Sequence, residues 1–385
     1  SQAAQCTTLR RFALVPGLEQ VRTTLPAAQA LAEFRANPWV EYAEPDYIQR
    51  KSAVPNDPYF GLEWGLHNLG QVINGTPGIP DADIDMTEAW ELGTGHADSV
   101  VAVIDTGVQS SHPDLDGNLW TNPGEVPGNG IDDDGNGYVD DVRGWDFFAG
   151  DNDPEDEDGH GTHVAGTIGA EGNNGLGVAG VSWRCRIMPL RFLGPLGGTT
   201  SDAIDALNYA VAKGVRVSNN SWGGGGNSMA LYEAIENARA MGHVFVAAAG
   251  NRGENIDRLP EYPAAYDLDN ILSVAAVDHR DQLASFSNVG AVGVDLGAPG
   301  VYVASTYTNS TYAWASGTSM AAPHVAGVVA LIFERFPELT HQQVIGRILS
   351  STRATPSLAG KCVTGGVLNA MAARADRNLG GPDGL

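Results

Sequence analysis

The chain has 385 residues, of which 43% are hydrophobic and 18% are charged, a composition typical of a globular protein with one large core and room for a smaller module. The net charge of −24 argues against a nucleic acid partner, because phosphate binding needs clustered Lys and Arg. The sequence has no run of about 18 apolar residues, so we expect no membrane span.

The first 53 residues have a different pattern from the rest and predict a small α+β module. Residues 9–23 and 39–51 alternate like strands. Residues 27–38 form a short amphipathic helix pattern with Ala, Leu and Phe on one face. A module of this size buries only a modest core by itself.

From about residue 90, short apolar segments alternate with helical patterns. Strands are predicted at 99–105, 184–193, 215–221, 243–251 and 270–278, and helices at 160–170, 202–214 and 229–242. This alternation predicts an α/β fold with three layers, in which a parallel sheet carries helices on both faces. Residues 319–336 are apolar nearly all round, which indicates a buried helix.

Four polar residues lie at the ends of these predicted elements. Asp105 and Asn251 end apolar strands, whereas His160 and Ser319 each open a helix. In a parallel sheet, the carboxyl ends of strands and the amino ends of helices meet at one edge, so the four residues can converge.

These residue types fit nucleophilic catalysis. A serine hydroxyl is a weak nucleophile and needs a neighbouring base, which a histidine can supply. A carboxylate fixes the histidine tautomer and stabilises its protonated form. The oxyanion formed on the substrate needs donors, which Asn251 and the backbone N–H of Ser319 can offer.

Four segments that carry these residues, VAVIDTGVQSSHPDL, DGHGTHVAGT, AAAGN and SGTSMAAPHVAG, resemble the signature segments of the subtilisin-like (subtilase) family, in that family's order. The resemblance covers about residues 57–375. It implies a secreted serine endopeptidase of subtilisin-like fold that acts on protein and peptide substrates as a monomer. It assigns the orienting carboxylate, the general base, the oxyanion donor and the nucleophile to Asp105, His160, Asn251 and Ser319.

Two other functions use the same residues. A peptide acyl transferase could employ the same triad, but we expect it to carry insertions that exclude water from the cleft, and none is evident. A non-catalytic pseudoprotease is disfavoured because all four site residues are intact. The neighbouring His163 and His324 are expected to be packed or hydrogen-bonded and not catalytic.

The resemblance also implies the substrate contacts. An extended peptide should add between two edge segments, 196–198 and 221–223, next to a pocket walled by residues 248–250. The predicted substrate-binding residues are Gly197, Gly198, Ser221, Trp222, Gly223, Ala248, Gly250 and Glu261. Trp222 either contacts substrate or only packs. Glu261 either lies at the base of the pocket, where it favours substrate Lys or Arg, or points to solvent.

The acidic loop 129–141 predicts a calcium site. Oxygen ligands alternate along it with Gly137 at the sixth position, as in the first half of an EF-hand loop. The twelfth position is Arg143 and not Glu, so Asp141 is the candidate that completes the shell. The predicted ligands are Asp132, Asp134, Asn136, Tyr138 and Asp140. The alternative is a solvated acidic loop.

Resemblance to the thermitase-like branch of the family implies a second structural calcium ion. Its ligands would be the side chains of Asp57, Asp114 and Asn174 and the carbonyls of Glu171, Leu176 and Val178. A third and weaker candidate site lies just before His160 and consists of Asp146, Asp151, Asp153 and Asp156. We therefore expect two or more structural calcium ions.

Residues 30–51 resemble the end of a subtilase prodomain, a ferredoxin-like module that guides folding and inhibits the enzyme. Residues 1–53 are thus interpreted as a prodomain that lacks the usual first strand, 54–378 as the catalytic domain and 379–385 as a tail. Processing of this zymogen is expected between about Lys51 and Val54.

The three cysteines show no spacing that suggests zinc. Cys185 and Cys362 both lie in the catalytic part and are candidates for a disulfide. Cys6 would then have no cysteine with which to pair.

Overall fold

The computed structural model describes residues 6–25, 27–44, 53–224 and 226–376. The chain divides into two units, Ser1–Lys51 and Ser52–Leu385. Each unit is described by itself.

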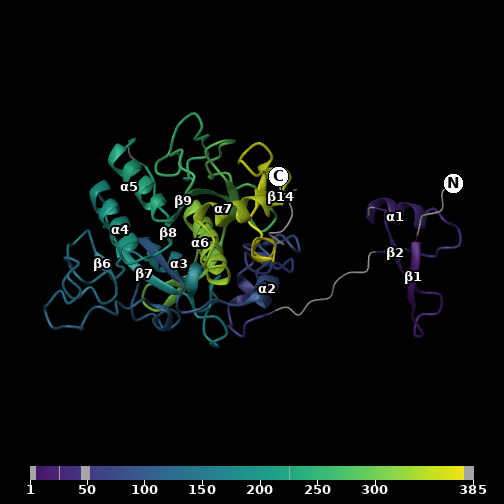
Figure 1. Ribbon diagram of the computed structural model, residues 1–385, viewed down its shortest axis with the longest axis horizontal. Coiled ribbons are helices and arrows are strands. Elements are labelled where there is room, and N and C mark those ends of the chain that lie inside the picture. The colour runs from purple at the N-terminus through teal and green to yellow at the C-terminus, as the bar shows by residue number, and fades with distance from the viewer. Residues whose placement is uncertain (1–5, 26, 45–52, 225, 377–385) are drawn as a thin grey trace. The chain divides into compact units, whose positions relative to one another are not determined.

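Over its described residues, the first unit contains a two-stranded antiparallel sheet and one helix (Figure 1). Strand β1 (Cys6–Arg11) pairs with β2 (Glu19–Thr23), and α1 (Ala27–Arg35) follows. The strand expected at 39–51 does not form over its described part, residues 39–44, and residues 45–51 lie outside the described range. Asn37 accounts for this, because its carbonyl and carboxamide oxygens take the N–H groups of Val40 and Trp39 into a turn. A ferredoxin-like prodomain is therefore not confirmed.

A nine-stranded, mostly parallel sheet forms the centre of the second unit, in the order β14-β15-β11-β10-β9-β8-β5-β7-β6. Its central strands confirm the five predicted ones: β5 (Val100–Asp105), β7 (Arg186–Arg191), β8 (Val217–Asn220), β9 (Val244–Ala248) and β10 (Ile271–Val277). The outer strands are β11 (Leu296–Pro299), β6 (Trp145–Asp146), β15 (Gly366–Val367) and β14 (Arg353–Ala354), the last antiparallel to β15. Side chains along β8, β9 and β10 are buried throughout, as expected for a parallel sheet covered on both faces.

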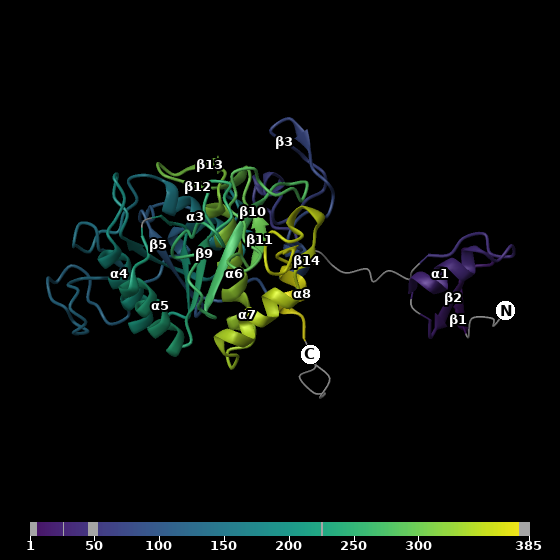
Figure 2. The same ribbon diagram turned by 90° about the horizontal axis from the view of Figure 1, so that it is seen from above.

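Helices cover both faces of this sheet, as predicted. The chain runs from β5 through β6 and α3 (His160–Gly169) to β7, and from β7 through α4 (Thr200–Ala212) to β8. Helix α6 (Thr318–Arg335) packs against α3, and α5 (Met229–Ala240) lies beside α4 (Figure 2).

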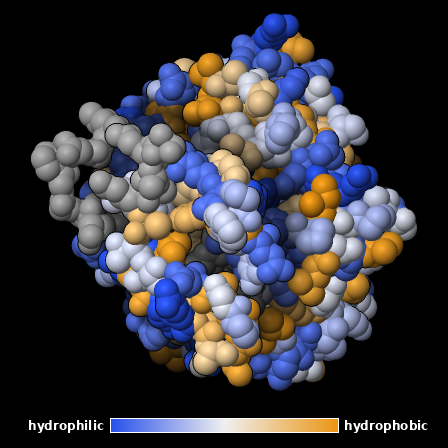
Figure 3. All heavy atoms as spheres, turned by 90° about the vertical axis from the view of Figure 1, so that its right-hand side faces the viewer, coloured by the Kyte–Doolittle hydropathy of each residue, from blue (hydrophilic) through white to orange (hydrophobic). Residues whose placement is uncertain are grey.

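The predicted buried helix is confirmed, because nearly all of α6 is buried, including Pro323. The smaller elements of this unit are α2 (Met86–Ala89), α7 (His341–Ser350), α8 (Ala370–Arg374) and the hairpins β3–β4 (Val72–Ile73, Thr76–Pro77) and β12–β13 (Val303–Tyr307, Thr311–Ala315). Short 3₁₀ helices span Phe60–Leu62, Trp90–Leu92, Asp116–Asn118 and Pro356–Leu358. The space-filling view in Figure 3 shows hydrophilic side chains interspersed with hydrophobic ones. In the described part of the chain, no helix has the length and apolar character that crossing a bilayer requires.

The expected disulfide between Cys185 and Cys362 is wrong, since both cysteines are free. Cys185 directly precedes β7 and Cys362 lies four residues before β15, and five strands separate β7 from β15 in the sheet. At ~4.8 Å per strand this places the two cysteines roughly 29 Å apart. A disulfide needs Cα atoms within about 7 Å.

Candidate active site

The Asp105–His160 pair lies where the carboxyl end of β5 meets the first residue of α3. The Asp105 side chain is fully buried, whereas 29% of the His160 side chain is exposed. The Nδ1 atom of His160 lies 2.6 Å from Asp105 Oδ1, which also accepts the N–H of Thr106 at 2.8 Å. The carboxylate therefore holds a proton on Nδ1 and leaves Nε2 free to exchange one.

The surroundings of His160 favour its protonated form. Burial is the largest single effect and lowers the pKa of the ring. The charge and hydrogen bond of Asp105 act in the opposite direction, and the charges of Asp158 and Asp156 add to them. The result is a pKa raised to about 9. His160 is thus a stronger base than an isolated histidine.

Asp156 fixes the start of α3 against the end of β5. Its Oδ2 accepts the N–H of Thr162 at 2.9 Å and the hydroxyl of the same residue at 2.6 Å. Its Oδ1 accepts the hydroxyl of Thr106 at 2.9 Å, and that hydroxyl oxygen accepts the N–H of Gly161 at 2.9 Å. Gly161 is required here, because a Cβ atom would lie 2.1 Å from the carbonyl oxygen of Gly107.

These contacts also correct the third calcium candidate. The Asp156 carboxylate accepts hydrogen bonds from the first turn of α3, and Asp146 forms an ion pair with Arg191 at 3.1 Å. Asp151 accepts the N–H of Asp153 at 3.1 Å. Within the described residues, these four carboxylates do not form a group that could bind a metal.

Ser319 is the second residue of α6 and contacts the segment that follows β8. Its hydroxyl donates to the carbonyl of Ser221 at 3.1 Å, and the Ser221 hydroxyl donates to the carbonyl of Ser319 at 2.7 Å. Because Val103 of β5 pairs with Asn219 of β8, continuation of this register places Asp105 level with Ser221. Ser319 therefore lies at the same sheet edge as the Asp105–His160 pair. In the described chain its hydroxyl bonds Ser221 and not His160, and catalytic bonds of this kind often tighten only with substrate.

Two hydrogen-bond donors converge beside Ser319. The Oδ1 atom of Asn251 accepts the backbone N–H of Thr318 at 2.8 Å and its hydroxyl at 3.0 Å, which orients the carboxamide. A Cβ atom placed on Gly317 would lie 3.5 Å from Asn251 Nδ2 and 3.6 Å from the backbone nitrogen of Ser319. Glycine at position 317 keeps this space open. The two donors can stabilise an oxyanion there.

The predicted substrate segments are brought together in part. Leu196 is fully exposed, and Gly194 and Gly197 form a β-bridge within an edge loop that includes Gly198. The Trp222 ring packs against Phe192, with centroids 4.9 Å apart, and more loosely against Phe245. The packing interpretation of Trp222 is therefore supported.

Glu261 does not point to solvent, because only 8% of it is exposed. Its Cγ lies 3.1 Å from where a Cβ on Gly250 would stand and 3.5 Å from the same point on Gly223. The segment after β8 also contacts the residue that follows Glu261, since the Gly224 N–H donates to the carbonyl of Tyr262 at 3.1 Å. Glu261 thus lies between Gly250 of the predicted pocket wall and Gly223 of the predicted edge segment.

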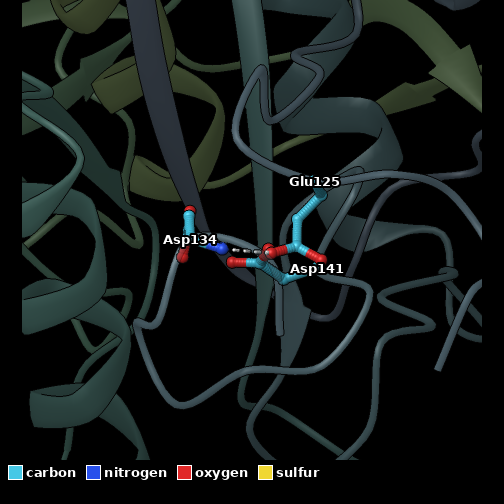
Figure 4. Close-up of side chains that lie close together, drawn as sticks. All are labelled: Glu125, Asp134 and Asp141. Atoms are coloured by element: carbon cyan, nitrogen blue, oxygen red, sulfur yellow. Dashed lines mark hydrogen bonds between the residues drawn. The ribbon is translucent and has the colours of Figure 1, made fainter. Parts of the chain in front are cut away.

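The acidic loop contains a group of three carboxylates that could hold a metal ion, Glu125, Asp134 and Asp141 (Figure 4). Glu125 is 8% exposed, and its Oε1 accepts the N–H groups of Asp133 and Asp134. Its buried Oε2 has no hydrogen-bond partner. A buried carboxylate oxygen without a partner is costly unless a cation binds it, so the donor set fits calcium.

This group differs from the predicted ligands. Asp132 and Asp140 bond backbone N–H groups of the loop instead, and the Tyr138 ring packs against Trp145. Asn136 donates to Asp141 at 2.7 Å and lies beside the group. Sequence reasoning missed Glu125, which precedes the loop.

Lys213, at the end of α4, contacts the same group. Its ammonium bonds Asp134 and lies 3.5 Å from Asp141. Asp141 also accepts the hydroxyl of Tyr209 at 2.5 Å, and burial together with this carboxylate raises the pKa of that tyrosine. The ion pairs of Lys213 with Asp134 and Asp141 therefore link the acidic loop to the end of α4.

The second predicted calcium set is brought together. Asn174 donates to Asp114 at 2.8 Å, and its backbone N–H donates to Asp57 at 3.1 Å. Burial raises the pKa of Asp114 to about 6, and Asp57 adds to this by repulsion. Asp114 also accepts the N–H of Val178, and its own carbonyl accepts the N–H of Glu171. Leu176 is held by the Asn174 carboxamide.

The two other histidines are packed, as predicted. His163 is buried with Nε2 3.0 Å from the carbonyl of Val303, and His324 has Nδ1 2.9 Å from the carbonyl of Met320. Burial lowers the pKa of each to about 4. Both are neutral at ordinary pH and lack a carboxylate partner of the kind that His160 has.

Comparison with known proteins agrees with this geometry. The chain matches the subtilase family over residues 96–373. It is 42% identical over 298 residues to the thermophilic serine proteinase of Bacillus sp. (strain AK1), covering 77% of this chain and 64% of that protein. It is 39% identical to thermitase of Thermoactinomyces vulgaris, covering 72% of this chain and 85% of thermitase.

Two further matches extend the comparison. An extracellular protease of Xanthomonas campestris pv. campestris is 35% identical over 95% of this chain and 65% of its own length. Among solved structures, a protease from Pseudoalteromonas arctica PAMC 21717 has a TM-score of 0.69 at 31% identity, over 84% of this chain and 99% of that one. The chain thus spans somewhat less than two thirds of the Bacillus and Xanthomonas relatives.

The site combines a buried carboxylate, a histidine and a serine, the residue types of serine hydrolases, on a large parallel sheet flanked by helices. The chain belongs to the subtilase family.

We expect the His160 ring, titrated by NMR in a Ser319→Ala protein, to show a pKa well above the ordinary value of about 6.5 and near 9. Because protonation is favoured in the folded state, His160 stabilises the fold fully below pH ~6.5, and this contribution is lost as the pH rises through 9. Asp158→Asn should lower the pKa, whereas Glu157→Gln, also at an exposed carboxylate, should not. A pKa at or below 6.5 would contradict the assigned surroundings.

Proposed function

We propose that this subtilase is an active endopeptidase that hydrolyses peptide bonds with Asp105, His160 and Ser319 as its catalytic triad. The observation that carries the proposal is the 2.6 Å bond between buried Asp105 and His160, at the same sheet edge as Ser319. The open space between the Asn251 carboxamide and the Ser319 N–H supports it, since that is where an oxyanion would need donors.

In the first step, Ser319 Oγ attacks the carbonyl carbon of the scissile peptide bond, and its proton passes to His160 Nε2. The carbonyl oxygen becomes an oxyanion between Asn251 Nδ2 and the Ser319 N–H. His160 then gives the proton to the leaving amine as the C–N bond breaks, which leaves an acyl-enzyme on Ser319.

In the second step, water replaces the amine. His160 takes a proton from the water, whose oxygen attacks the acyl carbon, and the proton returns to Ser319 Oγ as the ester bond breaks. Asp105 stays ionised and compensates the charge on His160 in both steps. Since the base must be neutral, the raised pKa of His160 places the active range at alkaline pH.

The chain is further proposed to be secreted as a zymogen whose residues 1–53 act as an intramolecular inhibitor. The extracellular protease of Xanthomonas campestris matches 95% of this chain, so at most about 20 residues lie outside the match and it must reach into the first unit. The remaining support is the resemblance of residues 30–51 to a prodomain.

Calcium is proposed to bind at two places and to stabilise surface loops. Glu125, Asp134 and Asp141 would hold one ion, and Asp57, Asp114 and Asn174 would hold the second. Bound calcium would satisfy the buried Glu125 oxygen and reduce repulsion between Asp57 and Asp114. The ions would act on the stability of the fold and take no part in the reaction.

Replacement of Asn251 by Leu should lower kcat roughly 10²–10³-fold with little change in KM, because the lost hydrogen bond forms only with the oxyanion. Steady-state kinetics on a peptide substrate tests this, with Ser319→Ala as the inactive reference. A large rise in KM at unchanged kcat would assign Asn251 to ground-state binding instead.

Calcium should raise the melting temperature of the Ser319→Ala protein, in which autolysis cannot interfere. The gain is about 2.7 kcal/mol of folding free energy at a 100-fold excess over Kd. Glu125→Gln should weaken calcium binding by about tenfold or more, since it removes one ligand charge. Glu233→Gln, at an exposed position of α5, is the matched control. Equal calcium responses in the two variants would remove Glu125 from the site.

A further inference from the structure

A buried carboxylate and an exposed arginine meet beside the oxyanion donor. Arg252 directly follows Asn251, and its Nη1 lies 3.3 Å from Glu261 Oε2. The Arg252 side chain is 62% exposed, whereas the Glu261 side chain is only 10% exposed. Most of the Arg252 side chain is thus in contact with solvent, and its guanidinium group contacts Glu261. The Glu261 side chain is mostly enclosed by neighbouring residues.

Glycines form the walls around this pair. A Cβ atom on Gly223 would stand 3.4 Å from Glu261 Oε1, and one on Gly224 would stand 3.8 Å from the same oxygen and 4.0 Å from Arg252 Nη2. On the other side, Gly250 approaches Glu261 Cγ. The carboxylate therefore lies between the segment after β8 and the segment after β9, which continues into Asn251.

The two partners of this ion pair depend on it to different degrees. A mostly exposed arginine regains its hydration when it leaves, so ion pairs of this kind contribute little. A carboxylate that is mostly buried loses much more when it stands without a cation. The structure thus combines a fixed anion with a cation that is easily displaced.

We propose that Arg252 is a specificity-determining residue that occupies the place of a substrate cation on Glu261. The inference rests on the proposed peptidase function and extends it to the substrate class. A substrate with Lys or Arg before the scissile bond displaces the Arg252 guanidinium and pairs with Glu261. A substrate with an apolar residue leaves the internal pair in place.

This arrangement predicts opposite effects for the two partners. Removal of Arg252 takes away the competitor and should favour basic substrates. Removal of the Glu261 charge takes away the anion that both cations use and should disfavour them. Arg258 supplies a matched control, because it is an exposed arginine of the same loop without an ion pair among the described residues.

The experiment measures kcat/KM of the full chain on tetrapeptide p-nitroanilides that differ only in the residue before the scissile bond, Lys, Arg, Phe or Leu. Arg252→Gln should raise the Lys/Phe ratio about 2- to 5-fold, the range expected for loss of a weak surface pair. Glu261→Gln should lower it about 10- to 100-fold, as expected for a charge-assisted contact. The Arg252→Gln effect should vanish in the Glu261→Gln background, and Arg258→Gln should leave the ratio within about twofold.

A binding measurement separates this inference from the catalytic proposal. The fluorescence of p-aminobenzamidine, a cationic probe, is followed on the inactive Ser319→Ala protein, so no turnover is needed. Arg252→Gln in this background should tighten probe binding and Glu261→Gln should weaken it. If the probe binds in this way but the wild type cleaves no peptide, the catalytic proposal fails and the pocket stands.

Three results would overturn the inference. The first is an equal Lys/Phe ratio in Arg252→Gln and Arg258→Gln proteins that both cleave peptides. The second is a fall of that ratio in Arg252→Gln, which would make Arg252 a contact for substrate and not a competitor. The third is a Glu261→Gln protein whose Lys/Phe ratio and probe affinity both equal those of the wild type.

Discussion

The burial of the Asp105 carboxylate at the end of β5 is the constraint on which the rest of the site depends. A fully buried carboxylate requires a partner, and the only cationic group beside it among the described residues is His160. The parallel sheet supplies this geometry without further cost, because its strands end and its helices begin at one edge. The start of α3 is held there by Asp156, which takes the donors of the first helical turn. Position, tautomer and basicity of His160 therefore follow from three acidic residues, Asp105, Asp156 and Asp158.

Carboxylates in narrow surroundings recur in this acidic protein. Asp105 binds a histidine, Glu261 binds an arginine, and Glu125 keeps one oxygen without a partner inside the protein. Each leaves a position that a cation stabilises, whether that cation belongs to the chain, to a substrate or to the solvent. The net charge of −24 thus has local roles in addition to its effect on solubility. The proposed calcium dependence and the proposed preference for basic substrates have the same physical origin.

The sequence predicted the central strands and the residues at their ends well, because apolar runs and short motifs are local signals. It could not predict contacts that depend on how distant loops close. Glu125 lies outside the acidic motif and joins it only when the loop folds back, and the direction of the Arg252 side chain has no signature. The disulfide expected between Cys185 and Cys362 was wrong, because chain order does not reveal that β7 and β15 lie toward opposite edges of the sheet. The strand expected around Trp39 gave way to a turn.

Reaction with a serine-selective fluorophosphonate tests the central claim most directly, because it requires a nucleophilic hydroxyl, a base and an oxyanion site together. Mass spectrometry of the digested protein locates the label. The account predicts one label per chain on Ser319, with a rate that rises with pH as His160 loses its proton and that collapses in Asp105→Asn. A label on another residue, or no reaction of the folded and processed wild-type protein at alkaline pH, would contradict it.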